Sequence, residues 1–343
     1  MTNSPSTAPL LDVRNLSVQF TTRGGTVTVL DDISFTLERG ERISFVGESG
    51  CGKSMTALAL MGLLPAMGRV SGGQVLFKGE DLTTASPARL RRLRGNEISM
   101  IFQEPMTSLN PVFTIGQQIS EVLRLHRGVD NAEARDWSVE LLQAVRIPDA
   151  AARVDDYPHQ LSGGQRQRVM IAIALACEPE ILIADEPTTA LDVTVQAEIF
   201  VLLRDLGAKL DTAIILITHD MGAVAQMSER MLVMYAGRRV EEGQVANVIK
   251  APAHPYTRGL IACVPHITSD VGALVDTLPE IDGIVPPITR FGRDECLFAP
   301  RCAKAADECW SAKPQQSDIA GHSSHSVSCW HPFGTEGLSL IHI

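Results

Sequence analysis

Alternating apolar and polar positions open the chain. Residues 13–20 and 27–35 alternate with a period of two, as half-buried strands do. A short run at residues 43–46, apolar except for Ser44, is typical of a buried strand and is followed by a glycine-rich loop and by helical spacing at residues 55–64. We therefore expect a β-rich entry and then a strand, a loop and a helix, which make half of a βαβ unit.

Farther along, the spacing turns helical and then returns to buried strands. Residues 115–145 are polar with helical periodicity, whereas residues 181–184 and 213–217 are short apolar runs with a helical segment, 193–210, between them. Such runs are typical of buried parallel strands. The pattern predicts an α/β fold with a helical insertion. After about residue 250 prolines are frequent and the periodicity fades, which indicates a domain boundary.

Composition narrows the range of partners. The 343 residues, 45% of them hydrophobic, suffice for one large domain and a smaller one. A net charge of -10 argues against a general affinity for nucleic acid, because neutralising phosphates needs a basic surface. Residues 1–15 lack the features of a signal peptide, and the longest apolar run, 169–177, is half a membrane span. We expect a cytoplasmic chain that does not cross a bilayer alone.

A glycine-rich motif stands between the strand at 43–46 and the helix after it. It matches the pattern G-x-x-x-x-G-K-[ST], in which backbone N–H groups and a helix N-terminus bind phosphates. Lys53 would reach the β- and γ-phosphates of a nucleotide and Ser54 would bind Mg²⁺, the alternative being a chance glycine-rich turn. The predicted ATP-binding residues here are Gly47, Glu48, Ser49, Gly50, Cys51, Gly52, Lys53 and Ser54.

Two carboxylates follow the buried strand at 181–184. Asp185 and Glu186 would emerge at the carboxyl edge of the sheet, near the phosphate-binding loop. Asp185 suits the Mg²⁺ shell and Glu186 suits the activation of water. By itself an acidic pair after a strand is more often a helix cap or a solvated turn, so the assignment depends on the other motifs.

Those other motifs carry a family resemblance. The sequence LSGGQ at residues 161–165, with Gln103 before it and Ala190-Leu191-Asp192 and His219 after it, resembles the ABC nucleotide-binding domain over about residues 10–250. The resemblance implies a P-loop NTPase fold with a RecA-like core, an antiparallel β subdomain and a helical subdomain at about residues 104–165.

The resemblance also implies roles for individual residues. Gln103 would contact Mg²⁺ and the attacking water, His219 would contact the γ-phosphate, and Glu186 would act in catalysis. Phe20 would stack on adenine, although a strand phenylalanine fits a core equally well. Two such domains would close head to tail, so that one chain completes the ATP site of the other with Ser162, Gly163, Gly164, Gln165 and Asp192.

Several stretches resemble one branch of the family, the D-type ATPase of oligopeptide and dipeptide importers. They are residues 98–111, 157–159, 165–173, 183–196 and 234–237. His254-Pro255-Tyr256-Thr257 begins the C-terminal extension of this branch, expected at residues 251–337. The branch implies two membrane permease subunits, a second ATPase subunit of the F type and an extracytoplasmic substrate-binding protein. It also implies a place at the cytoplasmic face of a bacterial membrane.

Four of the seven cysteines are clustered. Cys296, Cys302, Cys309 and Cys329 have spacings C-x5-C-x6-C-x19-C, which fit neither paired zinc knuckles nor the common ferredoxin pattern. The spacing leaves an iron-sulfur centre, zinc and free thiols as alternatives. In the branch that the sequence resembles, such a quartet implies a [4Fe-4S] cluster.

The expected function is ATP hydrolysis that drives the import of di- or oligopeptides, with nickel, glutathione or an opine as alternative cargo. A soluble ABC ATPase of DNA repair or translation is a rival, but 57 residues between Gln103 and Leu161 leave no room for a long insertion. A regulator without turnover is a second rival, against which Glu186 and His219 both argue. Residues 338–343 are taken as a non-native tail.

Overall fold

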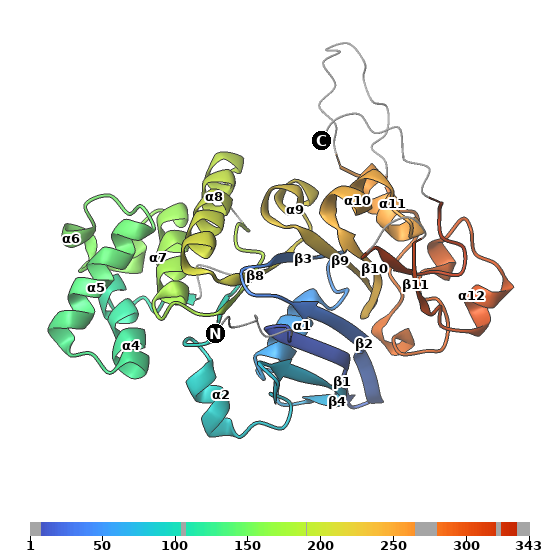
Figure 1. Cartoon of the computed structure of the whole chain (residues 1–343), viewed down its shortest axis with the longest axis horizontal. Coiled ribbons are helices and arrows are strands. Elements are labelled where there is room, and N and C mark those ends of the chain that lie inside the picture. The colour runs from blue at the N-terminus through green and yellow to red at the C-terminus, as the bar shows by residue number, and fades with distance from the viewer. Residues whose placement is uncertain (1–7, 104–107, 190, 265–279, 320–323, 335–343) are drawn as a thin grey trace, which may run out of the picture. The chain divides into compact units, whose positions relative to one another are not determined.

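The computed structural model of the chain contains two compact units (Figure 1). The first takes in Leu37–Arg42 and Thr84–Ile217, and the second takes in Leu11–Thr36, Ile43–Thr83 and Thr218–Ile343. Ala190 and the tail at 338–343 lie outside the described residues, which are 8–103, 108–189, 191–264, 280–319 and 324–334.

Three parallel strands form the sheet of the first unit. They are β6 (Ile98–Ile101), β7 (Ile181–Asp185) and β8 (Ala213–Thr218), with Ile98 opposite Ile181 and Ile181 opposite Ala213. β7 and β8 are buried throughout, as expected for parallel strands that are covered on both faces. The two apolar runs of the sequence are therefore strands, and α8 (Val193–Leu210) has the bounds that the sequence predicts.

The helical part of the first unit lies beyond α7 (Gly163–Leu175), on the side away from β8 (Figure 1). The stretch predicted as one helical segment, 115–145, consists of two helices. Gly128 ends the first of them in a left-handed conformation (φ 68°), and the Asp130 side chain accepts hydrogen bonds from the first turn of the second. The helices of this part are α4 (Ile115–Arg127), α5 (Asn131–Ala144) and α6 (Ala150–Arg153), and α2 (Pro87–Leu93) precedes them.

The second unit begins with an antiparallel sheet in the order β2-β1-β4-β5. Its long strands are paired with Leu11 opposite Phe77 and Phe20 opposite Gly68. This sheet is the β-rich entry that the alternating pattern predicts. The strands are β1 (Leu11–Thr22), β2 (Gly25–Leu37), β4 (Gly68–Phe77) and β5 (Glu80–Asp81).

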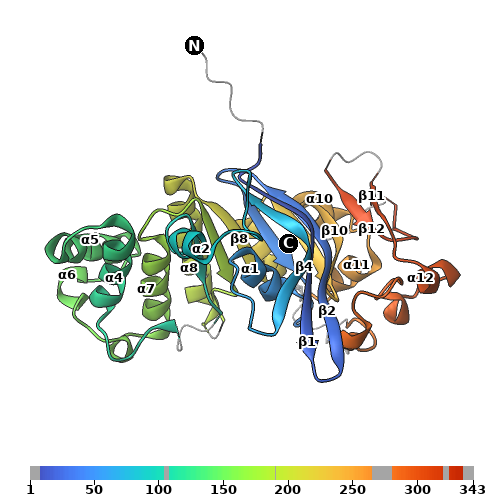
Figure 2. The same cartoon turned by 90° about the horizontal axis from the view of Figure 1, so that it is seen from below.

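A second series of strands in this unit joins the strand before the glycine-rich loop to the C-terminal segment, which is the described part of residues 251–334. β3 (Arg42–Val46) pairs in parallel with β9 (Arg230–Tyr235), which pairs with β10 (Arg238–Gln244). β12 (Ser326–Ser328) and β11 (Gln316–Asp318) continue the series beyond β10 (Figure 2). The helices are α1 (Lys53–Leu60), α9 (Met221–Met227), α10 (Val245–Lys250), α11 (Pro255–Ala262) and α12 (Asp307–Ser311).

The bounds of α1 differ from the prediction. The sequence predicts a helix at 55–64, whereas α1 begins at Lys53 and ends at Leu60. The glycine-rich loop leads directly into the first turn. Gly62 adopts a left-handed conformation (φ 61°), and its N–H bonds to the Ala59 carbonyl, which ends the helix before Pro65 is reached.

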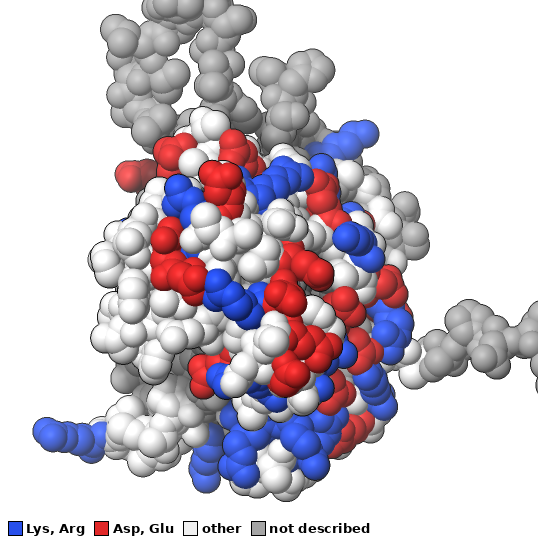
Figure 3. Space-filling model, turned by 90° about the vertical axis from the view of Figure 1, so that its left-hand side faces the viewer, with Lys and Arg blue, Asp and Glu red and all other residues white. Residues whose placement is uncertain are grey.

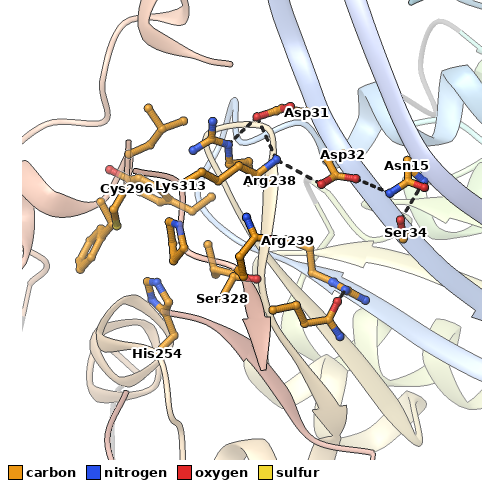
Figure 4. A pocket seen from close by; sticks show the side chains of 17 residues that line it. Asn15, Asp31, Asp32, Ser34, Arg238, Arg239, His254, Cys296, Lys313 and Ser328 are labelled. Atoms are coloured by element: carbon orange, nitrogen blue, oxygen red, sulfur yellow. Dashed lines mark hydrogen bonds and ion pairs between the residues drawn. The ribbon is translucent and has the colours of Figure 1, made fainter. Parts of the chain in front are cut away.

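A cavity of about 210 Å³ lies between the first β-strands and the C-terminal segment of the second unit (Figure 4). Each cationic side chain in it has a carboxylate partner. Arg238 bonds to Asp31 at 2.7 Å, Lys313 lies 3.3 Å from both Asp31 and Asp32, and Arg239 bonds to Glu242. We assign these paired charges to holding the segments together rather than to a ligand.

Within the described residues, every helix is too short or too polar to span a bilayer. The face shown in Figure 3 carries both acidic and basic side chains, and basic side chains gather at its lower edge. Neither feature assigns a partner by itself.

Candidate functional site

The phosphate loop connects β3 to α1 in the second unit, as predicted. Its backbone requires glycine at two positions. Gly47 has φ 152° and a Cβ there would lie 2.3 Å from the Met234 carbonyl oxygen, while Gly52 has φ 107° and a Cβ there would lie 2.7 Å from Leu30. Only glycine combines these angles with such close neighbours. The loop is therefore a tight turn packed against the strands, with α1 starting directly after it.

Lys53 is buried, 5% exposed, and lies against the loop. Its Nζ atom donates to the carbonyl oxygens of Gly47 at 2.7 Å and Glu48 at 3.1 Å. A phosphate would offer the same ammonium group stronger, charged acceptors. Burial raises the pKa of the neighbouring Cys51 thiol, although Lys53 opposes the shift, so the neutral thiol is favoured.

Gln103 and Glu186 meet in the first unit. The Gln103 amide donates to the Glu186 carboxylate at 2.8 Å, and the Thr189 hydroxyl lies 3.2 Å from the same oxygen. Glu186 has φ 45°, a left-handed conformation uncommon for a residue other than glycine, and its N–H bonds to the Ile217 carbonyl. This strained residue directly follows β7. The last residue of β7, Asp185, is buried, with 5% of its surface exposed.

The LSGGQ sequence forms the start of α7, also in the first unit. Ser162 is the N-cap, and it exchanges hydrogen bonds with Gln165 in a capping box of 3.3 and 3.0 Å. Ser162 and Gly163 are exposed. A Cβ at Gly164 would lie 2.8 Å from Val195 Cγ1, so this position has little room for a side chain. Asp192 caps α8 through the Val195 N–H at 3.0 Å.

His219 and Phe20 belong to the second unit. His219 is exposed between β8 and α9, directly before the Asp220 cap of α9. Phe20 lies on β1, and its ring covers Gly68 of β4, where a Cβ would lie 2.7 Å from the ring. The site residues predicted from the sequence are thus divided between the two units, and their roles toward ATP stay predictions.

The four clustered cysteines line one small cavity of about 10 Å³, together with His254, Lys304 and His331 among others. Burial raises the pKa of Cys296 and Cys302, and that of Cys329 to about 11, so protonated thiols are favoured. Among the described residues no group of His, Cys, Asp and Glu side chains has an arrangement that could hold a metal ion. The four cysteines line the same cavity, but in this arrangement they fit neither a [4Fe-4S] cluster nor zinc.

Two residues that the sequence analysis missed contact the phosphate loop. The Tyr256 hydroxyl accepts from the Glu48 N–H at 2.7 Å, and Arg301 pairs with the Glu48 carboxylate at 2.8 Å. They lie 208 and 253 residues from Glu48. No local periodicity or motif encodes contacts over such separations, and Tyr256 stands in a stretch that turn chemistry alone identifies only as a loop.

Comparison with known proteins places these features in a family. The ABC transporter family matches residues 30–189, and the family described as oligopeptide/dipeptide transporter, C-terminal region, matches residues 240–309.

Relatives of known name match nearly the whole chain. A peptide import ATP-binding protein of Brucella abortus is 53% identical, over 94% of this chain and 96% of its own length. The oligopeptide transport ATP-binding protein OppD of Salmonella typhimurium is 50% identical, over 91% of each chain. The dimeric structure of MJ0796, a bacterial ABC transporter cassette, has a TM-score of 0.62 at 27% identity, over 68% of this chain and 98% of that one. The chain therefore belongs to the ABC transporter family, as an ATP-hydrolysing subunit of its oligopeptide/dipeptide transporter branch.

Proposed function

We propose that this chain binds ATP with Mg²⁺ and hydrolyses it to drive the import of di- or oligopeptides across the cytoplasmic membrane. The observation that carries the proposal is the identity of 53% to a peptide import ATP-binding protein over 94% of the chain. This similarity spans the C-terminal region as well as the ATP-binding part. A cassette that resembled other transporters only in its ATP site would be similar over the ATP-binding part and not over the C-terminal region.

The proposed chemistry needs positioning and charge neutralisation more than covalent catalysis. Lys53 would bind the β- and γ-phosphates. Ser54, Asp185 and Gln103 would supply oxygen ligands of the kind that Mg²⁺ prefers, and the ion would neutralise charge on the phosphates. Glu186, held by Gln103, would accept the proton of the attacking water, and His219 would contact the γ-phosphate. Phe20 would stack on adenine.

The proposed assembly supplies the rest of the site. The exposed N-terminus of α7, with Ser162, Gly163, Gly164 and Gln165, would contact the γ-phosphate bound by a partner ATPase, and Asp192 would lie at the same interface. We propose an F-type subunit as that partner, two membrane permeases, and a substrate-binding protein outside the membrane. The chain would lie at the cytoplasmic face. Residues 10–250 would form the ATPase domain, 104–165 its helical subdomain and 251–337 the extension.

A [4Fe-4S] cluster on the four cysteines stays a prediction from the resemblance. Because the thiols do not fit such a group in the arrangement described, we derive no step through it. Iron, sulfide and zinc contents of the anaerobically purified chain decide between a cluster, zinc and free thiols. Stoichiometric iron with acid-labile sulfide would require the thiols to rearrange, whereas metal-free protein with four reactive thiols would leave them as packing groups.

Uptake of labelled peptides tests the function. Cells that lack their own peptide importers receive the transporter genes with this chain, with Glu186→Gln or with Glu198→Gln. Glu198 is a matched control: it lies on α8, and its half-exposed carboxylate pairs with Arg168 of α7. Peptide uptake should require Glu186 but not Glu198.

Other outcomes decide between the alternatives. If Glu186→Gln lowers only the entry of nickel, glutathione or an opine, the importer mechanism stands and peptide is the wrong cargo. If no uptake depends on Glu186, the chain is a regulator or a soluble ATPase, and its failure to sediment with membranes containing the permeases would identify the latter.

A further inference from the structure

Glu48, the second residue of the phosphate loop, is bonded to the C-terminal segment through both its backbone and its side chain. Its N–H donates to the Tyr256 hydroxyl at 2.7 Å. Its two carboxylate oxygens accept from the Arg301 guanidinium at 2.8 and 3.1 Å. The loop that receives phosphate thus rests on residues that lie beyond the conventional ATP-binding motifs of the sequence.

All the N–H donors of the Arg301 side chain are hydrogen-bonded. A guanidinium has five N–H groups. Two of them bond to Glu48, and the others donate to the Asp282 carbonyl at 2.8 Å, the Ile281 carbonyl at 2.9 Å and the Tyr235 hydroxyl at 3.4 Å. The side chain is 3% exposed. A planar fork held at every donor is preorganised for one bidentate carboxylate partner, so lysine could not reproduce the contact.

Arg301 keeps its charge in this contact, and Tyr256 stays neutral. Burial opposes the charge on Arg301, but the hydrogen bonds to Glu48 and Tyr235 outweigh it and raise the pKa of Arg301 above its ordinary value. Burial also raises the pKa of the Tyr256 hydroxyl, which therefore stays neutral and can accept from Glu48.

The contact bears on ATP through charge and through geometry. Glu48 is an acidic group in a loop whose ligand carries several negative charges, so without a partner its carboxylate would repel the phosphates. Glu48 also bonds through its carbonyl oxygen to Lys53 Nζ at 3.1 Å. Arg301 therefore neutralises the unfavourable charge and fixes the peptide against which Lys53 lies.

We propose that Arg301 is a positioning residue of the ATP site, through which the C-terminal segment sets the affinity of the phosphate loop for ATP. Arg301 acts through Glu48 and does not itself touch the nucleotide. The inference rests on the proposed use of ATP by this chain. It gives the C-terminal segment a role in nucleotide binding besides any role in assembly.

Binding of MgATP to the full chain, measured by calorimetry, and ATP turnover by the assembled transporter test the proposal together. Arg301→Ala should raise the Kd and the KM for ATP roughly tenfold, within the range of ordinary coupling between sites. The kcat should change by less than about twofold, because no group at the reacting atoms is altered. Arg290→Ala is the matched control, since Arg290 pairs with Glu295 at 2.7 Å in the same segment. This control should keep the wild-type Kd.

The double variant Glu48→Gln/Arg301→Ala separates positioning through Glu48 from a general loss of structure. It removes the unpaired carboxylate, so it should bind ATP more tightly than Arg301→Ala alone. An unchanged Kd in Arg301→Ala, or a double variant no tighter than the single one, would overturn the proposal. Lys53→Ala sets the reference for lost binding: if the wild type binds no better than it, the proposed function itself fails.

Arg301→Lys covers the case in which Arg301→Ala does not fold. It keeps the positive charge but loses the bidentate fork, so its Kd should lie between that of the wild type and tenfold above it. Tyr256→Phe removes the acceptor of the Glu48 N–H and should also raise the Kd. Wild-type affinity in both variants would show that the contact has no influence on ATP binding.

Discussion

The Gln103 side-chain amide donates to the Glu186 carboxylate at 2.8 Å, which joins the segments that follow β6 and β7. The Thr189 hydroxyl also donates to Glu186, to the backbone carbonyl oxygen of Glu186 at 3.1 Å and to its carboxylate at 3.2 Å. The carboxylate proposed as the catalytic base is therefore held by two neighbours. Its left-handed backbone conformation is tolerated because these bonds and the one to Ile217 fix it.

Gln103→Ala should lower the kcat of the assembled transporter about tenfold, because a base that is no longer oriented loses much of its positioning advantage. The KM for ATP should change little, since Gln103 is proposed to act on Mg²⁺ and water rather than on the nucleotide. Steady-state ATP turnover checks this. Gln143→Ala, at an exposed position of α5, should keep the wild-type rate; an equal loss in both variants would remove Gln103 from the mechanism.

Gly52→Ala should abolish ATP binding. Alanine would be strained at φ 107°, and its Cβ would lie 2.7 Å from the buried Leu30 side chain, so the loop or that side chain must shift where α1 begins. Calorimetric titration with MgATP checks the loss.

Gly79→Ala separates strain from function. Gly79 has φ 82°, but among the described residues nothing lies within 4 Å of a Cβ there. It should cost about 1 kcal/mol of the free energy of unfolding and leave ATP affinity unchanged. If Gly52→Ala bound ATP as Gly79→Ala does, the packing of the loop would not matter for its function.

Elements with a local signal were predictable. The bounds of α8 agree with the sequence because Asp192 caps it and its apolar spacing continues to Leu210. β7 and β8 were found because a parallel strand covered on both faces is a continuous apolar run. The end of α1 was predicted too late, because Gly62 can adopt a helical as well as a left-handed conformation and only the tertiary context selects the latter.

Contacts over long separations were not predictable. β12 pairs with β10 through only a few residues, and Arg301 reaches Glu48 across 253 positions. Neither depends on periodicity or turn chemistry, which are the properties that a single sequence displays. The clustering of the cysteines in the sequence agrees with their place around one cavity, but it does not give the arrangement of their sulfur atoms, on which metal binding depends.

Ser162→Ala should affect stability and turnover separately. Loss of the N-cap of α7 should cost about 1 kcal/mol in the free energy of unfolding. If Ser162 also contacts the partner's ATP, turnover by the assembled transporter should fall while ATP binding to the isolated chain is kept. Thr114→Ala is matched to it, because Thr114 caps α4 in the same kind of capping box with Gln117. Equal turnover in the two variants, at equal stability loss, would limit Ser162 to capping.

His254 makes the stability of the second unit depend on pH. It is buried, and its Nδ1 atom accepts from the Tyr256 N–H at 3.0 Å at the start of α11. Burial lowers the pKa of His254 to about 4, although the nearby Glu241 opposes the shift. Glu241 accepts from the backbone N–H of His254 at 2.8 Å, so the carboxylate is already engaged by the backbone. A protonated ring would lose the cap and carry a charge into the core.

Stability should therefore fall as the pH drops. The unfolded chain, with a His254 pKa near 6.5, binds more protons than the folded chain between pH 6.5 and about 4, so the contribution of His254 is complete above pH 6.5 and is lost through this interval. The full shift corresponds to on the order of 3 kcal/mol. Urea unfolding at pH 7.5, 6, 5 and 4.5 measures it. His254→Asn keeps a capping side chain but cannot be protonated, so its free energy of unfolding should be lower at pH 7.5 and fall less steeply. Parallel curves for the two proteins would assign the acid sensitivity to other groups.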